Sequence, residues 1–238
     1  MQLQYDFHLH SCLSPCGDND MTPYNLVNMA KLWGLDAIAL TDHNTVGNCR
    51  SAMAVGADIG LTVLPGMELC TAEEIHVVCL FPDIEKAEAF GAVVHTQLPP
   101  IKNKPDIYGE QRLMDARDNV IGTEELLLVA ASFITIDDVP GLVAAHGGFC
   151  YPAHIDRSSF SILSTLGTIT ADMGFICAEI SAQGAAAALT AAHPDLAQMR
   201  LMCSSDAHYL ENMREADDII DPPQNTPQAI IDWLRGLK

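Results

Sequence analysis

Residues 4–10 read QYDFHLH, and this stretch is the first indication of the fold. Its short apolar pattern is typical of a buried strand, and the strand ends in two histidines. The same arrangement returns at residues 37–43, AIALTDH, where an apolar strand ends in Thr-Asp-His. Between the two strands, Thr22 and Pro23 are suited to begin a helix and Gly34 to end it. The chain therefore opens as a β-α-β unit.

Later segments repeat this alternation of strand and helix. We expect further strands at residues 61–64, 75–81, 149–151, 175–180 and 201–203. We expect helices near residues 45–58, from residue 84, from residue 123 and near residues 227–237. Residues 99–122 carry prolines, glycines and charges without clean periodicity, so we interpret them as a long excursion. The pattern predicts an α/β fold that forms a single domain over residues 1–238.

Composition narrows the possible partners. The chain has 238 residues, 49% of them apolar, with 12 Lys+Arg and 31 Asp+Glu and a formal charge of −19. Because basic surface supplies most of the affinity for phosphate backbones, we expect no nucleic-acid partner. No segment has the pattern of a signal peptide or of a membrane span, so we expect a cytoplasmic protein without a membrane partner. The eight cysteines are scattered without a C-x-x-C motif, which predicts reduced core thiols.

Histidines and carboxylates gather where the predicted strands end. These positions are His8, His10, Asp42, His43, Glu68, His154, Asp206 and His208. In a parallel barrel such ends converge on one face. Residues two apart in an extended segment project to the same side, so His8 and His10 could bind one ion. Asp206 and His208 repeat this arrangement in a distant part of the chain.

The number of these residues favours a metal site with several ions. Six of the nine histidines, His76 included, lie in or near the motifs, which is more than one ion needs. Imidazole combined with carboxylate suits Zn, Mn or Fe better than Ca or Mg. A lone histidine at a strand end is more often structural, and Thr-Asp-His at residues 41–43 could be a turn with a helix cap. A metal site, however, accounts for all of these polar residues together.

The order of the motifs is itself informative: H-x-H, T-D-H, a later Glu and His, P-A-H, and S-D-A-H. This order resembles the PHP (polymerase and histidinol phosphatase) family of metal-dependent phosphoesterases. The resemblance runs from His8 to His208. It implies a distorted (β/α)7 barrel with a trinuclear site at the strand ends. It also implies two to three divalent ions (Zn, Mn or Fe) per chain and hydrolysis by metal-activated water.

The resemblance further implies a ligand set for each ion. The first ion would be held by His8, His10, Glu68 and Asp206. The second would be held by His43, His208 and an acidic residue of the first loop. The third would be held by Glu68, His76 and His154. The first loop departs from the family's S-D-G-like sequence and reads SPCGDND at residues 14–20. Its ligand is therefore Asp18 or Asp20, and we favour Asp18.

Three residues are candidates for supporting roles. Asp42 is a catalytic candidate that would orient a neighbouring ligand, and Glu179 either faces the site or is structural. The positive charge of three divalent ions exceeds the negative charge of three ligating carboxylates, so the pocket would attract a phosphate dianion despite the acidic chain. Arg157, three residues after His154, is the catalytic and substrate-binding candidate for gripping that phosphate, with a surface ion pair as the alternative.

These residues predict a metal-dependent phosphoric ester hydrolase. We expect it to act on a small phosphorylated metabolite or a nucleotide-like phosphate. The alternatives are a metal-dependent amide hydrolase, a nuclease-like PHP module, and a metal-binding domain without catalysis.

Overall fold

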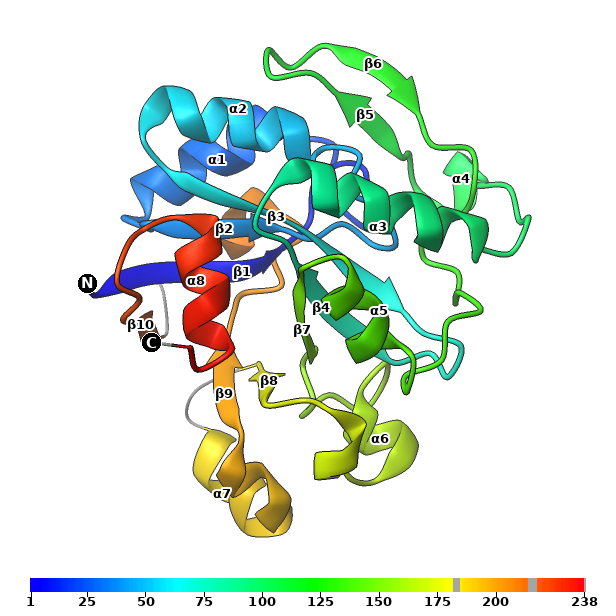
Figure 1. Cartoon of the computed structure of the whole chain (residues 1–238). Helices are drawn as coiled ribbons and strands as arrows, with labels where there is room; N and C mark the ends of the chain where they lie inside the picture. Colours follow the sequence, from blue (N-terminus) through cyan, green and yellow to red (C-terminus); the bar gives the residue numbers. More distant parts are fainter. Residues whose placement is uncertain (182–184, 214–217, 238) are drawn as a thin grey trace.

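The computed structural model describes residues 1–181, 185–213 and 218–237 of the chain (Figure 1). The strands are β1 (Leu3–Leu9), β2 (Ala37–Leu40), β3 (Thr62–Cys70), β4 (His76–Leu80), β5 (Arg112–Met114), β6 (Val120–Thr123), β7 (Phe149–Pro152), β8 (Cys177–Ile180), β9 (Arg200–Cys203) and β10 (Ile219–Ile220). The α-helices are α1 (Pro23–Leu32), α2 (Cys49–Ile59), α3 (Ile84–Thr96), α4 (Pro105–Tyr108), α5 (Val139–Ala145), α6 (Ile162–Leu166), α7 (Ala186–Ala192) and α8 (Pro227–Leu234). Short 3₁₀ turns occupy Ala171–Met173 (η1), Pro194–Gln198 (η3) and Leu210–Asn212 (η4).

The strands form one large sheet and two small ones. The large sheet has the order β10-β1-β2-β3-β4-β7, and β8 pairs with β9 and β5 with β6 in separate two-stranded sheets. A bridge between Leu9 and Ala207 links the end of β1 to the segment after β9. The result is a mixed α/β single-domain fold with a curled sheet. The finer prediction, a (β/α)7 barrel, is not confirmed by this strand pairing.

The direction of β4 differs from the expected βα repeat. β1, β2 and β3 are parallel, but β4 is antiparallel to both β3 and β7. The reason is the short connection at residues 71–75, where the Thr71 amide donates to the Ile75 carbonyl over 2.9 Å. A parallel crossover needs about a dozen residues or more. The reversal places His76, the first residue of β4, opposite Cys70 at the end of β3.

The large sheet separates two apolar cores. Ile38 and Leu40 of β2 belong to the core that includes the buried faces of α1, α2 and α3. Ala37 and Ala39, which alternate with them, belong to the second core together with Ile230 of α8. Figure 1 shows α1, α2 and α3 grouped on one side of the sheet and α8 apart from them. Both faces are covered, so polar residues of the sheet such as His8 and Glu68 are buried.

Local capping explains the helix boundaries that the sequence predicted. The Thr22 side chain accepts a hydrogen bond from the Asn25 amide over 3.2 Å, Pro23 is the first residue of α1, and Gly34 has φ of 77° just beyond its end. Thr226 caps α8 in the same way. These two helices are confirmed.

The excursion at residues 99–122 contains α4 and most of the β5–β6 hairpin. The helix expected from Thr123 does not form in the segment between β6 and α5. β6 ends at Thr123. The side-chain amide of Gln111 donates to the carbonyls of Glu124 and Leu126 over 3.0 and 2.6 Å. Its oxygen accepts from the backbone amide of Leu128 over 2.9 Å. These bonds replace the backbone pairing that a helix would supply, so the prediction was wrong.

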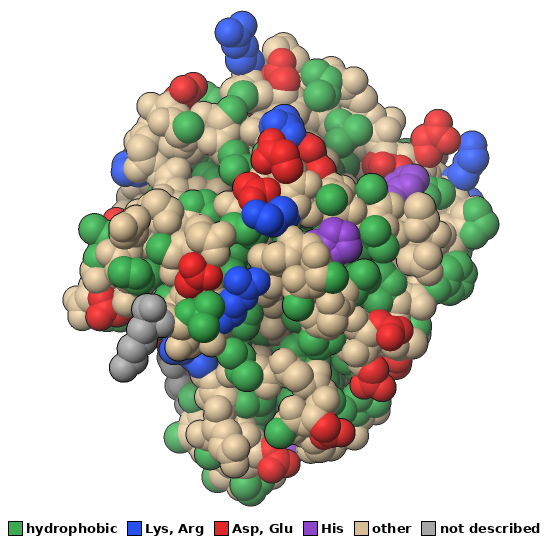
Figure 2. Space-filling model, in the orientation of Figure 1, with side chains coloured by type: hydrophobic (Ala, Val, Ile, Leu, Met, Phe, Trp, Pro, Cys, Tyr) green, Lys and Arg blue, Asp and Glu red, His purple; other side chains and the backbone are tan. Residues whose placement is uncertain are grey.

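The surface in Figure 2 mixes acidic, basic and apolar side chains without a large patch of one sign on that face. In the described part of the chain, no helix has both the length and the apolar character needed to cross a bilayer. Seven of the eight cysteines are buried, all except Cys16.

Candidate metal centre

Residues far apart in the sequence converge at one edge of the large sheet. β1 supplies His8 and, one residue beyond its end, His10; the segment after β2 supplies His43, and β3 supplies Glu68. The remaining members are His76, His154, Asp206 and His208, which come from the start of β4 and from the segments after β7 and β9. His8 and His10 have no exposed surface, and Glu68 is 1% exposed. This convergence puts six imidazoles and two carboxylates in one buried cluster.

Glu68 lies at the centre of the cluster. Its oxygens are 3.1 Å from His8 Nε2, 3.3 Å from His10 Nε2, 2.8 Å from His43 Nδ1, 2.9 Å from His76 Nδ1 and 3.1 Å from His154 Nε2. Asp206 Oδ1 lies 3.3 Å from His8 Nε2 and 3.2 Å from His10 Nε2. One carboxylate therefore contacts five histidines, a geometry suited to bridging cations.

Within the described residues, three overlapping groups have ligand atoms within 4.8 Å of one another. They are His8, His10, Glu68 and Asp206; His10, His43 and His208; and His43, Glu68 and His76. The first group contains the same residues that were expected to hold the first ion. His10 takes the place of a first-loop acid in the second group, and His43 takes the place of His154 in the third.

The donor atoms of this cluster fit divalent cations. Several are buried without a well-formed hydrogen bond: His8 Nε2, His10 Nε2, His43 Nδ1, Glu68 Oε2 and Asp206 Oδ1. Buried polar atoms without partners are costly, and metal ions would satisfy all of these at once. Neutral imidazole and carboxylate are the ligand types of Zn, Mn and Fe sites.

Neighbouring side chains set the orientation of two of the imidazoles. His8 Nδ1 pairs with Glu179 Oε1 over 2.8 Å, and His10 Nδ1 pairs with Ser14 Oγ over 2.9 Å. The Ser14 hydroxyl donates to Asp42 Oδ1 over 2.7 Å. These bonds leave Nε2 of both histidines directed at Glu68 and Asp206, as in metal sites with supporting carboxylates.

Asp42 forms its hydrogen bonds with serines outside the cluster. It accepts from the Ser11 amide over 2.7 Å and from the Ser11 hydroxyl over 2.6 Å, in addition to Ser14. It therefore acts on His10 through Ser14. Sequence reasoning missed Ser14, because a serine four residues after His10 carries no signal until the chain folds back onto Asp42.

Burial and neighbouring charges raise the pKa of some imidazoles in the cluster and lower the pKa of others. Burial favours the neutral form, but the nearby carboxylates of Asp206 and Glu68 raise the pKa of His10 to about 9. Burial likewise opposes the charge on His43, yet the Glu68 charge raises its pKa to about 9. Burial and the neighbouring charge of His10 lower the pKa of His208 to about 3. His10 and His43 thus hold protons at neutral pH, and bound cations would replace those protons.

The first loop was expected to supply a ligand from Asp18 or Asp20. The Asp18 carboxylate accepts a hydrogen bond from the Asp20 amide over 2.8 Å. Among the described residues, neither aspartate belongs to a group of converging ligand atoms. The Cys16 side chain instead lies near His43 and contributes to the raised pKa of that imidazole. The assignment of Asp18 as a ligand stays a prediction.

A small cavity opens onto the cluster. Its volume is about 130 Å³, and its wall includes His43, Glu68, His76, His154, Arg157, Ser159, Phe160, Asp206 and His208. Arg157 lies at the rim, with a side chain that is 44% exposed and with Nη1 2.5 Å from Asp206 Oδ2. Phe160 also lines this cavity, and sequence reasoning missed it. The cavity therefore joins the candidate ligands to one guanidinium and one aromatic ring.

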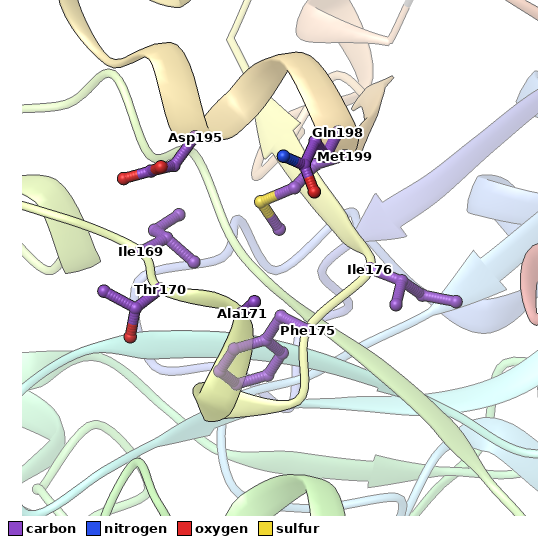
Figure 3. Close-up of a pocket in the computed structure, with 8 residues that line it drawn as sticks. All are labelled: Ile169, Thr170, Ala171, Phe175, Ile176, Asp195, Gln198 and Met199. Carbon is purple, nitrogen blue, oxygen red and sulfur yellow. The ribbon is translucent and has the colours of Figure 1, made fainter.

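Another hollow lies between η1 and η3, away from the cluster (Figure 3). Its volume is about 180 Å³, and it is lined by Ile169, Thr170, Ala171, Phe175, Ile176, Asp195, Gln198 and Met199. Asp195 is the one titratable side chain in this lining, so the hollow lacks the convergent polar groups of a catalytic site.

Comparison with known families agrees with the geometry. The family model described as the PHP domain matches residues 6–220. The chain belongs to the PHP domain family. PHP proteins are metal-dependent hydrolases, and the buried His, Glu and Asp groups of this chain could hold divalent metal.

Two curated proteins match this chain over limited segments. A 5′-3′ exoribonuclease of Haemophilus influenzae is 34% identical over 83 residues, which cover 34% of this chain and 29% of that protein. An uncharacterized protein of Methanocaldococcus jannaschii is 31% identical over 93 residues, which cover 35% of this chain and 54% of that protein. The matches thus span less than two thirds of either relative.

Solved structures share the fold of this PHP chain. The lesion-specific endonuclease EndoQ of Pyrococcus furiosus superposes with a TM-score of 0.70 at 16% identity, covering 100% of this chain and 57% of that one. A putative metal-dependent phosphoesterase of Bifidobacterium adolescentis superposes with a TM-score of 0.57 at 20% identity, covering 86% and 87% of the two chains.

The expectation that nucleic acid is not a partner is corrected by these comparisons. An endonuclease Q structure that matches with a TM-score of 0.68, at 14% identity and over 100% of this chain and 57% of that one, is a complex with a 27-mer duplex carrying an abasic lesion at the active site. Net charge was a poor guide, because a site that binds divalent cations attracts phosphate locally even in an acidic protein.

Proposed function

We propose that this PHP chain is a divalent-metal-dependent phosphoesterase with its active site at the cluster around Glu68. The observation that carries the proposal is the set of orphaned, buried donor atoms that face one another around that carboxylate. Two to three ions of Zn, Mn or Fe, bound within a barrel-like domain over residues 1–238, would satisfy them.

The supporting residues have distinct tasks in this proposal. Ions bound here would supply an activated water nucleophile and would draw charge from the phosphoryl oxygens. Glu179 and the Asp42–Ser14 pair hold the rings of His8 and His10 in the orientation that presents Nε2 to the centre. His208 is neutral at pH 7 and so offers a lone pair without first losing a proton.

Arg157 favours a phosphoester over an amide as the substrate. Its guanidinium stands at the rim beside Asp206, where it would meet the oxygens of a phosphoryl group entering the cavity. A guanidinium binds two phosphate oxygens at once, whereas a neutral amide offers one carbonyl oxygen. Arg157 thus serves as both substrate-binding and catalytic residue in the proposal.

The size of the cavity bears on the substrate. A cavity of about 130 Å³ has room for several waters, so it can admit a phosphoryl group. We propose a small phosphorylated metabolite or a nucleotide-like phosphate as substrate. Cleavage of nucleic acid is a second candidate, favoured by the likeness to EndoQ and to the exoribonuclease.

A reconstitution and release screen tests this function. Purified protein is stripped with chelator, reloaded with Mn, Zn or Fe, and assayed on sugar, amino-alcohol and nucleotide phosphates, on oligonucleotides and on N-acyl compounds. Phosphate release that depends on metal supports the proposal. Cleavage of oligonucleotides alone would select the second candidate, and turnover of N-acyl compounds alone would refute phosphoester hydrolysis.

A further inference from the structure

Phe160 is a large apolar side chain at the mouth of an otherwise polar cavity. It is 44% exposed, and it lines the cavity together with Arg157 and Ser159 of the same loop. Exposed aromatic rings are common on protein surfaces, but this one stands beside the candidate ligands. Its position relative to them is therefore the first observation to explain.

One face of the Phe160 ring is already packed. The ring stacks on the imidazole of His76 with centroids 4.6 Å apart and planes inclined by 25°. His76 is buried, whereas Phe160 is not, so the solvent-facing surface lies on the phenyl ring. A ring that stacks on an imidazole and is still 44% exposed has surface left for a second planar ring to stack on.

The backbone of this loop is anchored independently of the ring. The Phe160 carbonyl accepts from the His76 amide over 3.0 Å, and the next residue, Ser161, donates from its hydroxyl to the Ile155 carbonyl over 2.8 Å. Phe160 has φ of 54°, a left-handed conformation that glycine or asparagine adopts at lower cost. The turn does not require a phenyl group, and strained residues of this kind gather at functional sites.

We propose that Phe160 is the leaving-group subsite of the enzyme and stacks against a planar ring of the substrate while Arg157 holds the phosphoryl group. This inference rests on the proposed phosphoesterase function and deepens it. The ligand chemistry is a phosphoester that carries an aromatic ring, either a nucleobase or a simple aryl group. A ring lying on the platform would leave the phosphoryl group directed into the cavity.

The test compares ring-bearing with aliphatic substrates. Phe160→Leu keeps the apolar bulk but removes the π face, and Phe133→Leu, at another ring that is 65% exposed, is the matched control. Substrates are adenosine 5′-monophosphate, 4-nitrophenyl phosphate and glycerol phosphate. In Phe160→Leu we expect the ratio of kcat/KM for a ring-bearing substrate to that for glycerol phosphate to fall roughly 5- to 140-fold, from stacking of ~1–3 kcal/mol. The control should retain the parental ratio.

Other outcomes are equally informative. An equal loss on all three substrates together with a loss of bound metal would show that Phe160 only supports His76, and the proposal would fail. An unchanged ratio would also overturn it. A fall confined to the nucleotide or to the nitrophenyl ester would identify which ring the platform takes.

A binding measurement separates this inference from the proposed function. Calorimetry with the zinc-loaded protein compares adenosine 5′-monophosphate and 4-nitrophenyl phosphate with inorganic phosphate. Tighter binding of either ring-bearing compound in the parent, lost in Phe160→Leu, supports the platform even without turnover. Binding of phosphate with no gain from either ring would refute the platform and leave the phosphoesterase proposal standing. Absence of binding to all three would refute both.

Discussion

Replacement of Glu68 by Gln is the sharpest perturbation of the candidate metal centre. The change keeps the shape of the side chain but removes the charge that lies within 3.3 Å of five histidine nitrogens. Breaking a buried charged network by neutralising one partner costs ~3–5 kcal/mol. At about 1.4 kcal/mol per decade, metal binding should weaken roughly 140- to 4,000-fold, and at least one ion should be lost at micromolar metal.

The assay is equilibrium competition with a chromophoric chelator, read together with elemental analysis of the gel-filtered protein. Glu179→Gln is the matched control, because Glu179 is equally buried but reaches the cluster through His8 Nδ1 and the His154 amide. Loss of such a supporting contact should weaken binding by only ~10–100-fold. Glu88→Gln, at an exposed pair with Arg50, should change nothing.

Circular dichroism of the metal-free variants must show that each remains folded. The bridging role would be refuted if Glu68→Gln bound as many ions as the parent with affinity within tenfold. It would also be refuted if Glu179→Gln were the more damaging change.

Three further predictions concern the rim, the first loop and pH. Arg157→Ala should retain its metal and lose ~2–4 kcal/mol of transition-state stabilisation, or roughly 30- to 1,000-fold in kcat/KM, with partial rescue by Lys; a loss below threefold would make Arg157 a surface residue. Asp18→Ala should lower metal content by one ion while Asp20→Ala stays near the parent, as elemental analysis will show; full metal in both would remove the loop from the ligand set. The pKa values of His10 and His43 are raised from the ordinary 6.5 to about 9. Their contribution to the stability of the metal-free protein is therefore present below pH 6.5 and is lost as pH rises through 9. Metal affinity should rise over the same range, because the imidazoles lose the protons that compete with metal. Urea denaturation of chelator-treated protein between pH 6 and 10 will check the first part, and metal titrations will check the second; metal-free stability that increased with pH would contradict it.

Local chemistry in the sequence was sufficient for much of the fold. The cap at Thr22, the proline after it and the apolar runs at residues 37–40 and 75–81 act over one helical turn or one strand, so they predict their elements without knowledge of the rest. The motif H-x-H predicts two imidazoles on one side of a strand end for the same reason. The convergence of strand ends in a parallel barrel linked these motifs into one expected site, and the family resemblance then implied a ligand set for each ion.

Long-range contacts decided what the sequence left open. Periodicity does not encode strand direction, and the short turn at residues 71–75 makes β4 antiparallel. The Gln111 side chain, rather than a helix, satisfies the backbone after Thr123. The first of these is a local turn that periodicity does not reveal, and the second is a set of hydrogen bonds from a side chain more than ten residues away.

The candidate metal centre likewise combines features that depend on local sequence with features that depend on long-range packing. Residue types that could bind metal, and the ends of the strands that carry them, could be recognised from the sequence, because both depend on neighbours a few positions away. Only the tertiary structure placed Glu68 within 3.1 Å of His154, 86 residues later, and brought Ser14 between Asp42 and His10. It also set Phe160 against His76. Such contacts depend on how the sheet curls and how loops cross its edge, and these are properties of packing over the whole chain rather than of any segment of it.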